Sequence, residues 1–200
     1  MQLSESSTVA PRPATIEINN GMRYQTEAEF LELLEIYKNI SNKRFVLEIG
    51  SMFGETLHEW MNCGEPGMHV ISIDMMVPPM DIRREEQERG HNVLWAQWAN
   101  EKNMALTLID ADSKNPEVIL KVRSLVPYLD FLFIDGGHDY ATVMSDFKNF
   151  HTLVRPGGII AFHDIGHLFE VIRCWNEVKS GRDFKEIVVK NGMGIGVLYV

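Results

Sequence analysis

The chain has 200 residues, which suits one globular domain. Hydrophobic residues make up 45% of it and charged residues 24%, so we expect a packed core and exclude extended disorder. A formal net charge of −9 argues against nucleic acid as a partner, because gripping a phosphate backbone needs a basic face.

Targeting and redox features favour a cytoplasmic protein. Residues 1–14 are rich in Ser, Thr and Pro, and we expect them to be flexible; they lack the basic start and apolar run of a signal peptide. No apolar run is long enough to span a bilayer. Cys63 and Cys174 are far apart in no metal-like spacing, so they are expected to be reduced thiols. A single domain is predicted over residues 15–200.

The first predicted element is an amphipathic helix. Thr26 and Glu29 stand at capping-box spacing at its start. Apolar residues then recur at helical intervals at Phe30, Leu33, Leu34 and Tyr37.

Short apolar runs then alternate with helical stretches. The strand-like runs are residues 45–49, 70–73, 106–109, 131–134 and 159–162. The helical stretches between them are residues 56–63, 81–89, 91–102, 116–125 and 140–154. Runs this apolar suit parallel strands covered on both faces, so the alternation predicts a Rossmann-like, doubly wound α/β sheet.

The C-terminal part departs from this alternation. Residues 168–179 are predicted to form a helix, followed by strands at 184–190 and 194–200. Asn191-Gly192 between two apolar runs is a strong hairpin signal. The prediction is therefore a mostly parallel, seven-stranded sheet with an antiparallel hairpin at its C-terminal edge.

The segment 75–91 resembles an insertion after the second predicted strand. Its charged residues are interpreted most simply as a solvated helix face. Trp95 and Trp98, which follow, favour the packed face of a helix over a substrate platform. Five histidines lack a functional context and are expected at the surface or its boundary: His58, His69, His91, His151 and His167.

A glycine pair connects the first predicted strand to the next helix. Gly50 and Gly54, with Ser51 between them, stand where backbone must approach a ligand closely, although a tight turn alone could also use them. Asp74 ends the second strand, where an acid in this architecture accepts hydrogen bonds from ribose hydroxyls. The third glycine of the dinucleotide fingerprint is missing, and Glu48 before the turn would repel a pyrophosphate. A cofactor with a cationic end fits better.

These residues resemble the first motif of the class I S-adenosylmethionine-dependent methyltransferases. The resemblance implies that the methyl donor is held by Glu48, Gly50, Ser51, Gly54 and Asp74. Asp112 and Ser113, after the third strand, resemble the Gly-Asp-Ser that meets the adenine ring in several relatives. Asp112 could also form an Asx turn or helix cap, and both roles are compatible.

Two further predicted strands end in polar side chains. Asp135 and His138 follow one strand, and His163 and Asp164 follow the next. Because parallel strands end at one edge of a sheet, these groups could converge. Carboxylates with imidazole suit a divalent ion that binds a substrate hydroxyl and lowers its pKa, with His138 as general base. Alternatively, His138 could cap the following helix and His163 could bond a nearby loop.

The order of these motifs resembles one branch of the family, the macrocin and mycinamicin O-methyltransferases and the cephalosporin hydroxylase-like proteins. The branch pattern is Asp-Gly-x-His-x-Tyr from Asp135, Asp146 one helix onward, Pro-Gly-Gly, and the pair at His163-Asp164. The resemblance implies a metal held by Asp135, His163 and Asp164, with Asp135 also facing the donor and His138 as base. Because His163 replaces an acid of that branch, Mn²⁺ or Fe²⁺ fits better than Mg²⁺.

The sequence therefore predicts metal-assisted O-methylation of a small acceptor, such as a sugar or a natural-product-like hydroxyl, with no membrane partner and a homo-oligomer left open. One alternative is a nucleotide-dependent oxidoreductase on the same fold, which the missing glycine disfavours. The other is a non-catalytic accessory domain that binds S-adenosylmethionine, which the intact Asp135, His138 and Asp164 disfavour.

Overall fold

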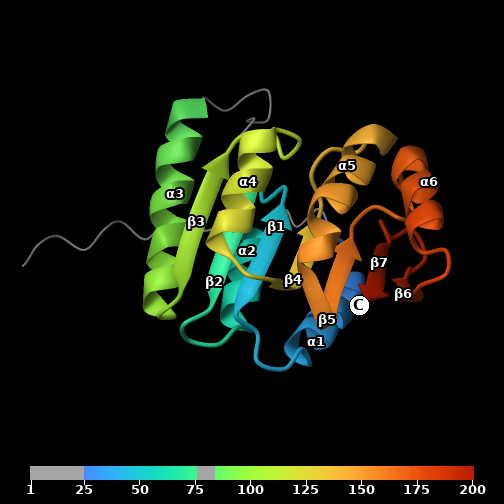
Figure 1. Ribbon diagram of the computed structural model, residues 1–200, viewed down its shortest axis with the longest axis horizontal. Coiled ribbons are helices and arrows are strands. Elements are labelled where there is room, and N and C mark those ends of the chain that lie inside the picture. The colour runs from blue at the N-terminus through green and yellow to red at the C-terminus, as the bar shows by residue number, and fades with distance from the viewer. Residues whose placement is uncertain (1–24, 76–83) are drawn as a thin grey trace, which may run out of the picture.

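A seven-stranded mixed sheet forms the centre of the computed structural model, which describes residues 25–75 and 84–200, with side chains outside the description over 84–92 (Figure 1). The strand order is β3-β2-β1-β4-β5-β7-β6. The strands are β1 (Phe45–Ile49), β2 (His69–Asp74), β3 (Ala105–Asp110), β4 (Leu129–Ile134), β5 (Val154–Phe162), β6 (Asp183–Ile187) and β7 (Ile195–Tyr199). Strands β1 to β5 pair in parallel, whereas β7 is antiparallel to both β5 and β6. The predicted fold class is confirmed.

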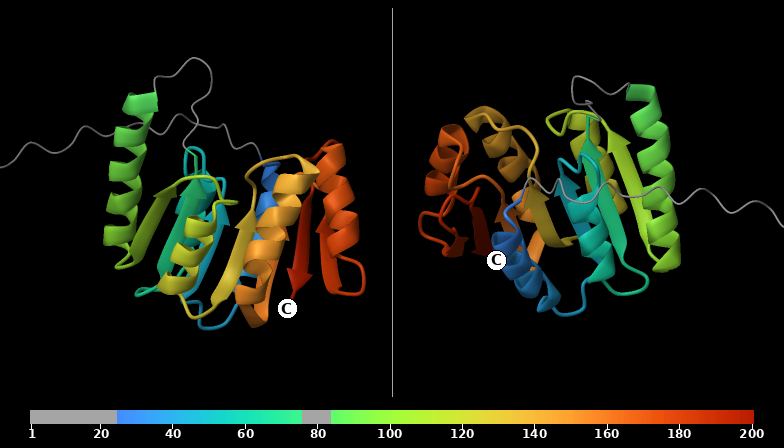
Figure 2. Two further views of the ribbon diagram at one scale, coloured as in Figure 1. Left: turned by 45° about the horizontal axis from the view of Figure 1, so that its top comes forward. Right: turned by 180° about the vertical axis from the view of Figure 1, so that it is seen from behind.

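Helices cover both faces of the sheet, as Figure 1 and the view from behind in Figure 2 show. The helices are α1 (Glu27–Lys38), α2 (Glu55–Asn62), α3 (Arg84–Glu101), α4 (Pro116–Leu125), α5 (Tyr140–Phe150) and α6 (Phe169–Val178). Side chains of α1, α2 and α3 pack into one hydrophobic cluster, and those of α4, α5 and α6 into another. Alternate residues of each central strand enter opposite clusters, so Leu47 joins one and Val46 the other. None of the described helices is long and apolar enough to cross a membrane.

Several boundaries differ from the prediction. The two helices expected at 81–89 and 91–102 form one described helix, α3, which runs through Gly90. Strand β5 begins at Val154 rather than 159, and a register shift against β4 accommodates the Pro-Gly-Gly segment, where Gly157 has φ +79°. The expected flexible segment 1–14 and residues 76–83 of the expected insertion lie outside the described residues. Trp95 and Trp98 are buried, as the packed-face interpretation requires.

The C-terminal hairpin forms, but not around a two-residue turn. Ile187 pairs with Ile195, so residues 188–194 make a longer loop between β6 and β7. This loop wraps the carboxylate of Glu29, which is fully buried. Glu29 accepts hydrogen bonds from the backbone N–H groups of Val189 (2.8 Å) and Gly194 (3.0 Å). The loop therefore combines this long-range contact with a local turn, in which the Val189 carbonyl accepts a hydrogen bond from the Gly192 N–H (2.9 Å).

The start of α1 also departs from its local motif. The helix begins after Thr26 as the capping-box spacing predicts, but the Thr26 side chain makes no capping hydrogen bond. Its hydroxyl instead accepts a hydrogen bond from the Met193 backbone N–H (3.3 Å). Glu29 accepts a hydrogen bond from Val189 in the same loop. Both residues of the predicted capping box thus join α1 to the β6–β7 loop.

Candidate functional site

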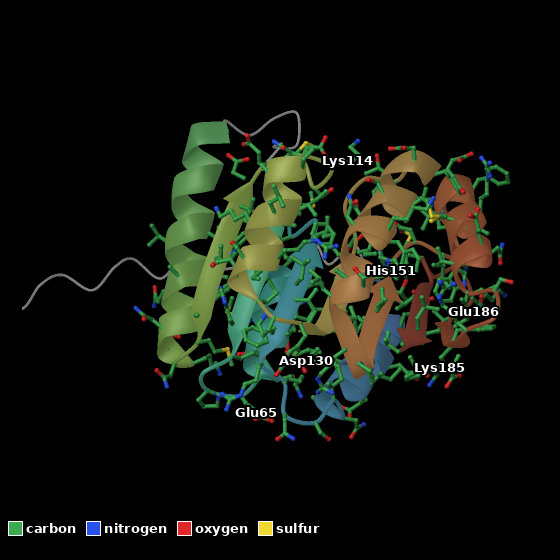
Figure 3. All side chains as sticks on the ribbon, viewed as in Figure 1. Glu65, Lys114, Asp130, His151, Lys185 and Glu186 are labelled. Carbon is green, nitrogen blue, oxygen red and sulfur yellow. The ribbon has the colours of Figure 1, made fainter. Side chains whose placement is uncertain are left out.

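A cavity of about 760 Å³ opens at the carboxyl ends of the parallel strands. This volume lies within the range of about 300–1,000 Å³ that is usual for small-molecule sites. It is lined on one side by the glycine turn and the end of β2, and on the other by the segments that follow β4 and β5. Figure 3 shows Lys114, a lining residue, at this end of the molecule and Asp130 at the opposite end. Every predicted site residue lines the cavity except Glu48 and Gly54.

The two glycines of the turn are required by packing within the protein. Gly50 has φ +86°, and a Cβ there would lie 2.1 Å from the backbone oxygen of Asp135. This close approach brings the ends of β1 and β4 together, so Gly50 and Asp135 line the same cavity. Gly54 has φ +79°, and its Cβ would lie 2.1 Å from the indole nitrogen of Trp95. Gly54 thus packs against α3 and does not line the cavity, and its contact with the donor stays a prediction.

Glu48 lies beneath the cavity instead of lining it. Its side chain is fully buried, and its carboxylate accepts hydrogen bonds from the Thr56 hydroxyl (2.5 Å) and the Trp60 indole N–H (2.8 Å). Burial raises the pKa of Glu48 to about 8. Strand alternation is the signal that could have revealed this, because Glu48 shares a strand face with Val46 and points toward α2. Glu48 is therefore not among the cavity-lining residues, and its direct contact with the donor stays a prediction.

Asp74 joins the end of β2 to the glycine turn. One of its carboxylate oxygens, Oδ2, accepts hydrogen bonds from the backbone N–H groups of Ser51 and Met52, both at 2.7 Å. The Ser51 and Ser72 hydroxyls lie 2.7 Å apart and add a second link between β1 and β2. Asp74 therefore orders the turn and also lines the cavity.

The segment after β3 supplies a further wall. Asp112 accepts a hydrogen bond from the Lys114 N–H (2.9 Å), which is the Asx turn considered from the sequence, and it also lines the cavity. The Ser113 hydroxyl donates to Asp146 Oδ1 (2.6 Å) on α5. Asp146 is fully buried, and burial raises its pKa to about 6. Its Oδ2 has no hydrogen-bond partner within the described part of the chain.

Asp135, His138 and Asp164 converge at the other end of the cavity. One candidate ligand atom from each lies within 4.8 Å of the others. His138 Nε2 is 3.2 Å from Asp164 Oδ2, and the His138 side chain is 55% exposed. His138 does not cap α5, because Asp139 does so by accepting a hydrogen bond from the Thr142 N–H (3.0 Å). Asp164 has φ +64°, a left-handed conformation that is uncommon outside glycine and often found at functional sites.

His163 is placed differently from the expectation. Its side chain is 4% exposed, and Nδ1 lies 3.1 Å from Asp135 Oδ1 and 3.4 Å from Asp164 Oδ1. Burial alone would lower the pKa of His163, but the hydrogen bond and charge of Asp135, followed by those of Asp164, raise it to about 10. His163 therefore lies between the two carboxylates, where its Nδ1 can donate to Asp135, while its Nε2 is buried without a hydrogen-bond partner among the described residues. The set able to surround an ion contains His138 in its place.

Sequence reasoning missed many of the cavity residues, among them Gln25, Lys114, His167 and Met193. Gln25 precedes α1, Lys114 follows Ser113, His167 follows the His163-Asp164 pair, and Met193 lies in the β6–β7 loop. No residue pattern marks Gln25 or Met193, because each reaches the cavity through long-range contacts. His167 had a usable signal, since it stands three residues after Asp164 at the end of a parallel strand.

Comparisons with known proteins agree with this architecture. A family model described as a methyltransferase domain matches residues 47–165. A curated relative, the uncharacterized protein y4gI of Sinorhizobium fredii, is 31% identical over 70 residues, which are 34% of this chain and 8% of that protein. The chain thus aligns with only a small part of that relative's length.

Two solved structures share the fold. The calicheamicin methyltransferase CalS11 has a TM-score of 0.67 at 10% identity, over 85% of this chain and 78% of that one. MycE from the mycinamycin biosynthetic pathway, solved with Mg and SAH, has a TM-score of 0.54 at 18% identity, over 85% of this chain and 48% of that one. Because the family model covers more than half of the chain, from β1 to just beyond β5, the chain belongs to the methyltransferase domain family.

Proposed function

We propose that this protein is an S-adenosylmethionine-dependent enzyme that methylates a hydroxyl oxygen of a small molecule, with Asp135, His138 and Asp164 at the reaction centre. The observation that carries the proposal is the single cavity in which these three side chains share the space with the glycine turn and Asp74. The donor would occupy the side formed by Ser51, Asp74, Asp112 and Ser113, which leaves the acceptor at the side formed by the Asp/His cluster.

The chemistry needs one bond made and one broken. The acceptor oxygen forms a bond to the methyl carbon while the carbon–sulfur bond breaks. The electron pair of the broken bond stays on sulfur, so the sulfonium becomes a neutral thioether. The hydroxyl proton passes to the imidazole of His138, whose positive charge Asp164 stabilises at 3.2 Å. Alignment of two reactants in one cavity supplies much of the remaining rate enhancement.

The cluster also fits a divalent ion in the chemistry of its donor set. Two carboxylates and one imidazole lie within 4.8 Å of one another. This donor set suits Mn²⁺ or Fe²⁺ better than it suits Mg²⁺, which prefers ligands that are all oxygen. Asp135, His138 and Asp164 would hold the ion, which would bind the acceptor hydroxyl and lower its pKa. In that form His138 is a ligand rather than the proton acceptor. The similar MycE structure, solved with Mg, supports testing for an ion.

Calorimetry with S-adenosylmethionine and with S-adenosylhomocysteine tests the donor half, and saturable binding is expected. Thioether release with a panel of neutral hydroxylated compounds tests the acceptor half. Asp135→Asn and His138→Gln should each lower turnover at least 100-fold. Two controls outside the cavity, Asp183→Asn at an exposed position and His151→Gln at a half-buried one, should not. Donor binding without turnover on any acceptor would instead favour an accessory domain.

Mn²⁺ titration followed by electron paramagnetic resonance decides the role of His138. If His138 is a ligand, His138→Gln weakens Mn²⁺ binding as strongly as Asp135→Asn does. If His138 is the base, the variant keeps its Mn²⁺ affinity and loses only turnover. Small neutral acceptors in a reducing, cytoplasmic compartment remain our proposal for the setting of this reaction, with nucleic acid disfavoured by the net charge of −9.

A further inference from the structure

The two oxygens of the Asp135 carboxylate have separate partners. Oδ1 accepts from His163 Nδ1 (3.1 Å), and Oδ2 accepts from the side-chain amide of Gln25 (2.7 Å). Gln25 precedes α1 and is 110 residues away in the sequence, yet it lines the same cavity. An amide at this place donates a hydrogen bond without adding charge, so it orients the carboxylate and leaves its negative charge available.

Gln25 is held in place by the β6–β7 loop through its neighbours on α1. The buried carboxylate of Glu29 accepts hydrogen bonds from backbone N–H groups near both ends of that loop, those of Val189 and Gly194. A Cβ on Gly192 would lie 2.1 Å from Glu29 Oε1, so the loop backbone closes tightly around this carboxylate. The Thr26 hydroxyl, adjacent to Gln25, accepts the Met193 N–H (3.3 Å).

The same loop is bonded to the segment that carries Asp164. Met193 accepts a hydrogen bond from the Gly166 N–H (2.7 Å), and Gly194 accepts one from the Ile165 N–H (3.2 Å). The start of α1, the β6–β7 loop and the segment after β5 are therefore one hydrogen-bonded unit. Two side chains of this unit bond Asp135, namely His163 after β5 and Gln25 before α1.

We propose that Gln25 is a positioning residue that fixes the Asp135 carboxylate for the reaction. It acts through Asp135 and not on the reacting atoms. The inference rests on the proposed function of the Asp135 cluster, but not on the presence of an ion.

The imidazole of His163 provides a readout that needs no acceptor. In long-range ¹⁵N–¹H spectra of the protein saturated with S-adenosylhomocysteine, the His163 Nδ1–H signal reports the orientation of Asp135, and His163→Gln assigns it. Gln25→Ala should shift or broaden this signal, and Gln25→Glu should do so more, because the nearly isosteric side chain replaces a donor with a like charge. Gln97→Ala is the matched control, since Gln97 donates to Glu101 on an exposed face of α3 and should leave the signal unchanged.

Mn²⁺ affinity gives the second readout. Partners that hydrogen-bond a metal ligand typically change metal affinity by 10–100-fold, so Gln25→Ala should weaken Mn²⁺ binding by about 10-fold or more while S-adenosylhomocysteine binding changes less than about twofold. Unchanged His163 spectra in both Gln25 variants, with Asp135→Asn still perturbing them, would overturn the inference and leave the proposed function standing. If wild-type protein binds no Mn²⁺, the spectra alone decide. If it binds no donor, the proposed function itself fails.

Discussion

At the scale of single residues, four acidic side chains differ in the groups that hydrogen-bond or pair with their carboxyl oxygens. Asp130 is fully buried at the amino end of β4, where it accepts the Arg44 and Phe45 N–H groups and pairs with Arg155. Glu48 is equally buried, but only neutral donors meet it. Asp135 and Asp164 instead border the cavity and both contact the His163 imidazole. The first two acids lie inside the fold, and of these four only Asp135 and Asp164 line the cavity.

Replacement of Glu48 by Gln tests whether this acid contacts the donor. The amide fits the same space, can accept from Trp60 and can donate to the Thr56 hydroxyl, so the packing beneath the turn is retained. We expect the dissociation constant of S-adenosylhomocysteine, measured by calorimetry at pH 7, to change less than about threefold (below roughly 0.7 kcal/mol). A loss of tenfold or more would return Glu48 to the donor-binding set.

Asp146 should make stability depend on pH in an unusual direction. Burial raises its pKa from 3.8 to about 6, so between these values the native chain keeps a proton that the unfolded chain has lost. The free energy of unfolding therefore falls as pH rises through this window, by on the order of 2–3 kcal/mol from this group. Asp146→Asn should reduce that slope in denaturant titrations at pH 4, 5 and 6. The exposed variant Asp183→Asn should not, and an unaltered slope in Asp146→Asn would contradict the assignment.

At the scale of elements, the turn between β1 and α2 packs closely against the backbone that follows β4. A methyl group at Gly50 would meet the backbone of Asp135 and Gly136 at 2.1–2.7 Å, which no side-chain movement can relieve. Gly181 offers a comparison, since it also has a positive φ, +72°, but no atom lies within 4 Å of its added Cβ. An added Cβ would strain the backbone at both glycines, but only at Gly50 of the two would it also collide with other atoms.

Gly50→Ala and Gly181→Ala should therefore differ in stability. Gly181→Ala incurs only the cost of a left-handed alanine, about 1 kcal/mol. Gly50→Ala adds the separation of β1 from β4, so a loss of about 3 kcal/mol or more is expected. Urea unfolding of both variants measures the difference, and equal losses would mean that the strand ends can move apart freely.

The elements were predictable from the sequence where local chemistry decides them, and less so elsewhere. Helix α4 begins and ends as predicted, because Asn115 caps it and Pro116 occupies its first turn. Asp135, His138 and Asp164 were found because polar residues after apolar strands meet at one sheet edge. The loop at 188–194 and the contact of Gln25 could not be found, since Glu29 and Asp135 act on segments more than 100 residues away. The buried position of His163 was not predictable, because sequence spacing does not report which imidazole is buried.

At the scale of the whole molecule, the cavity draws on both ends of the described chain. Gln25 and Met193 line it together with residues from the ends of β1, β2 and β4. A ligand in this cavity therefore contacts segments that unfolding would separate. Its binding free energy should appear directly as resistance to unfolding.

Thermal unfolding with S-adenosylhomocysteine measures this coupling. At 100 times its dissociation constant the ligand should stabilise the native state by about 2.7 kcal/mol. For a domain of this size, that corresponds to a rise in Tm of roughly 5–11 °C. NAD at the same concentration is the control and should leave Tm unchanged; a larger shift with NAD would revive the oxidoreductase interpretation.

The strand order also constrains how the chain is made. β7 lies between β5 and β6, although it is the last strand along the sequence. A nascent chain leaving the ribosome can pair β1 to β5, but the outer edge of β5 stays bare and β6 lacks its only described neighbour until residues 195–199 emerge. A premature stop codon just before Ile195 would remove none of the cavity residues. It would still leave the edges of β5 and β6 unpaired, so that strands of different chains could pair there and aggregate.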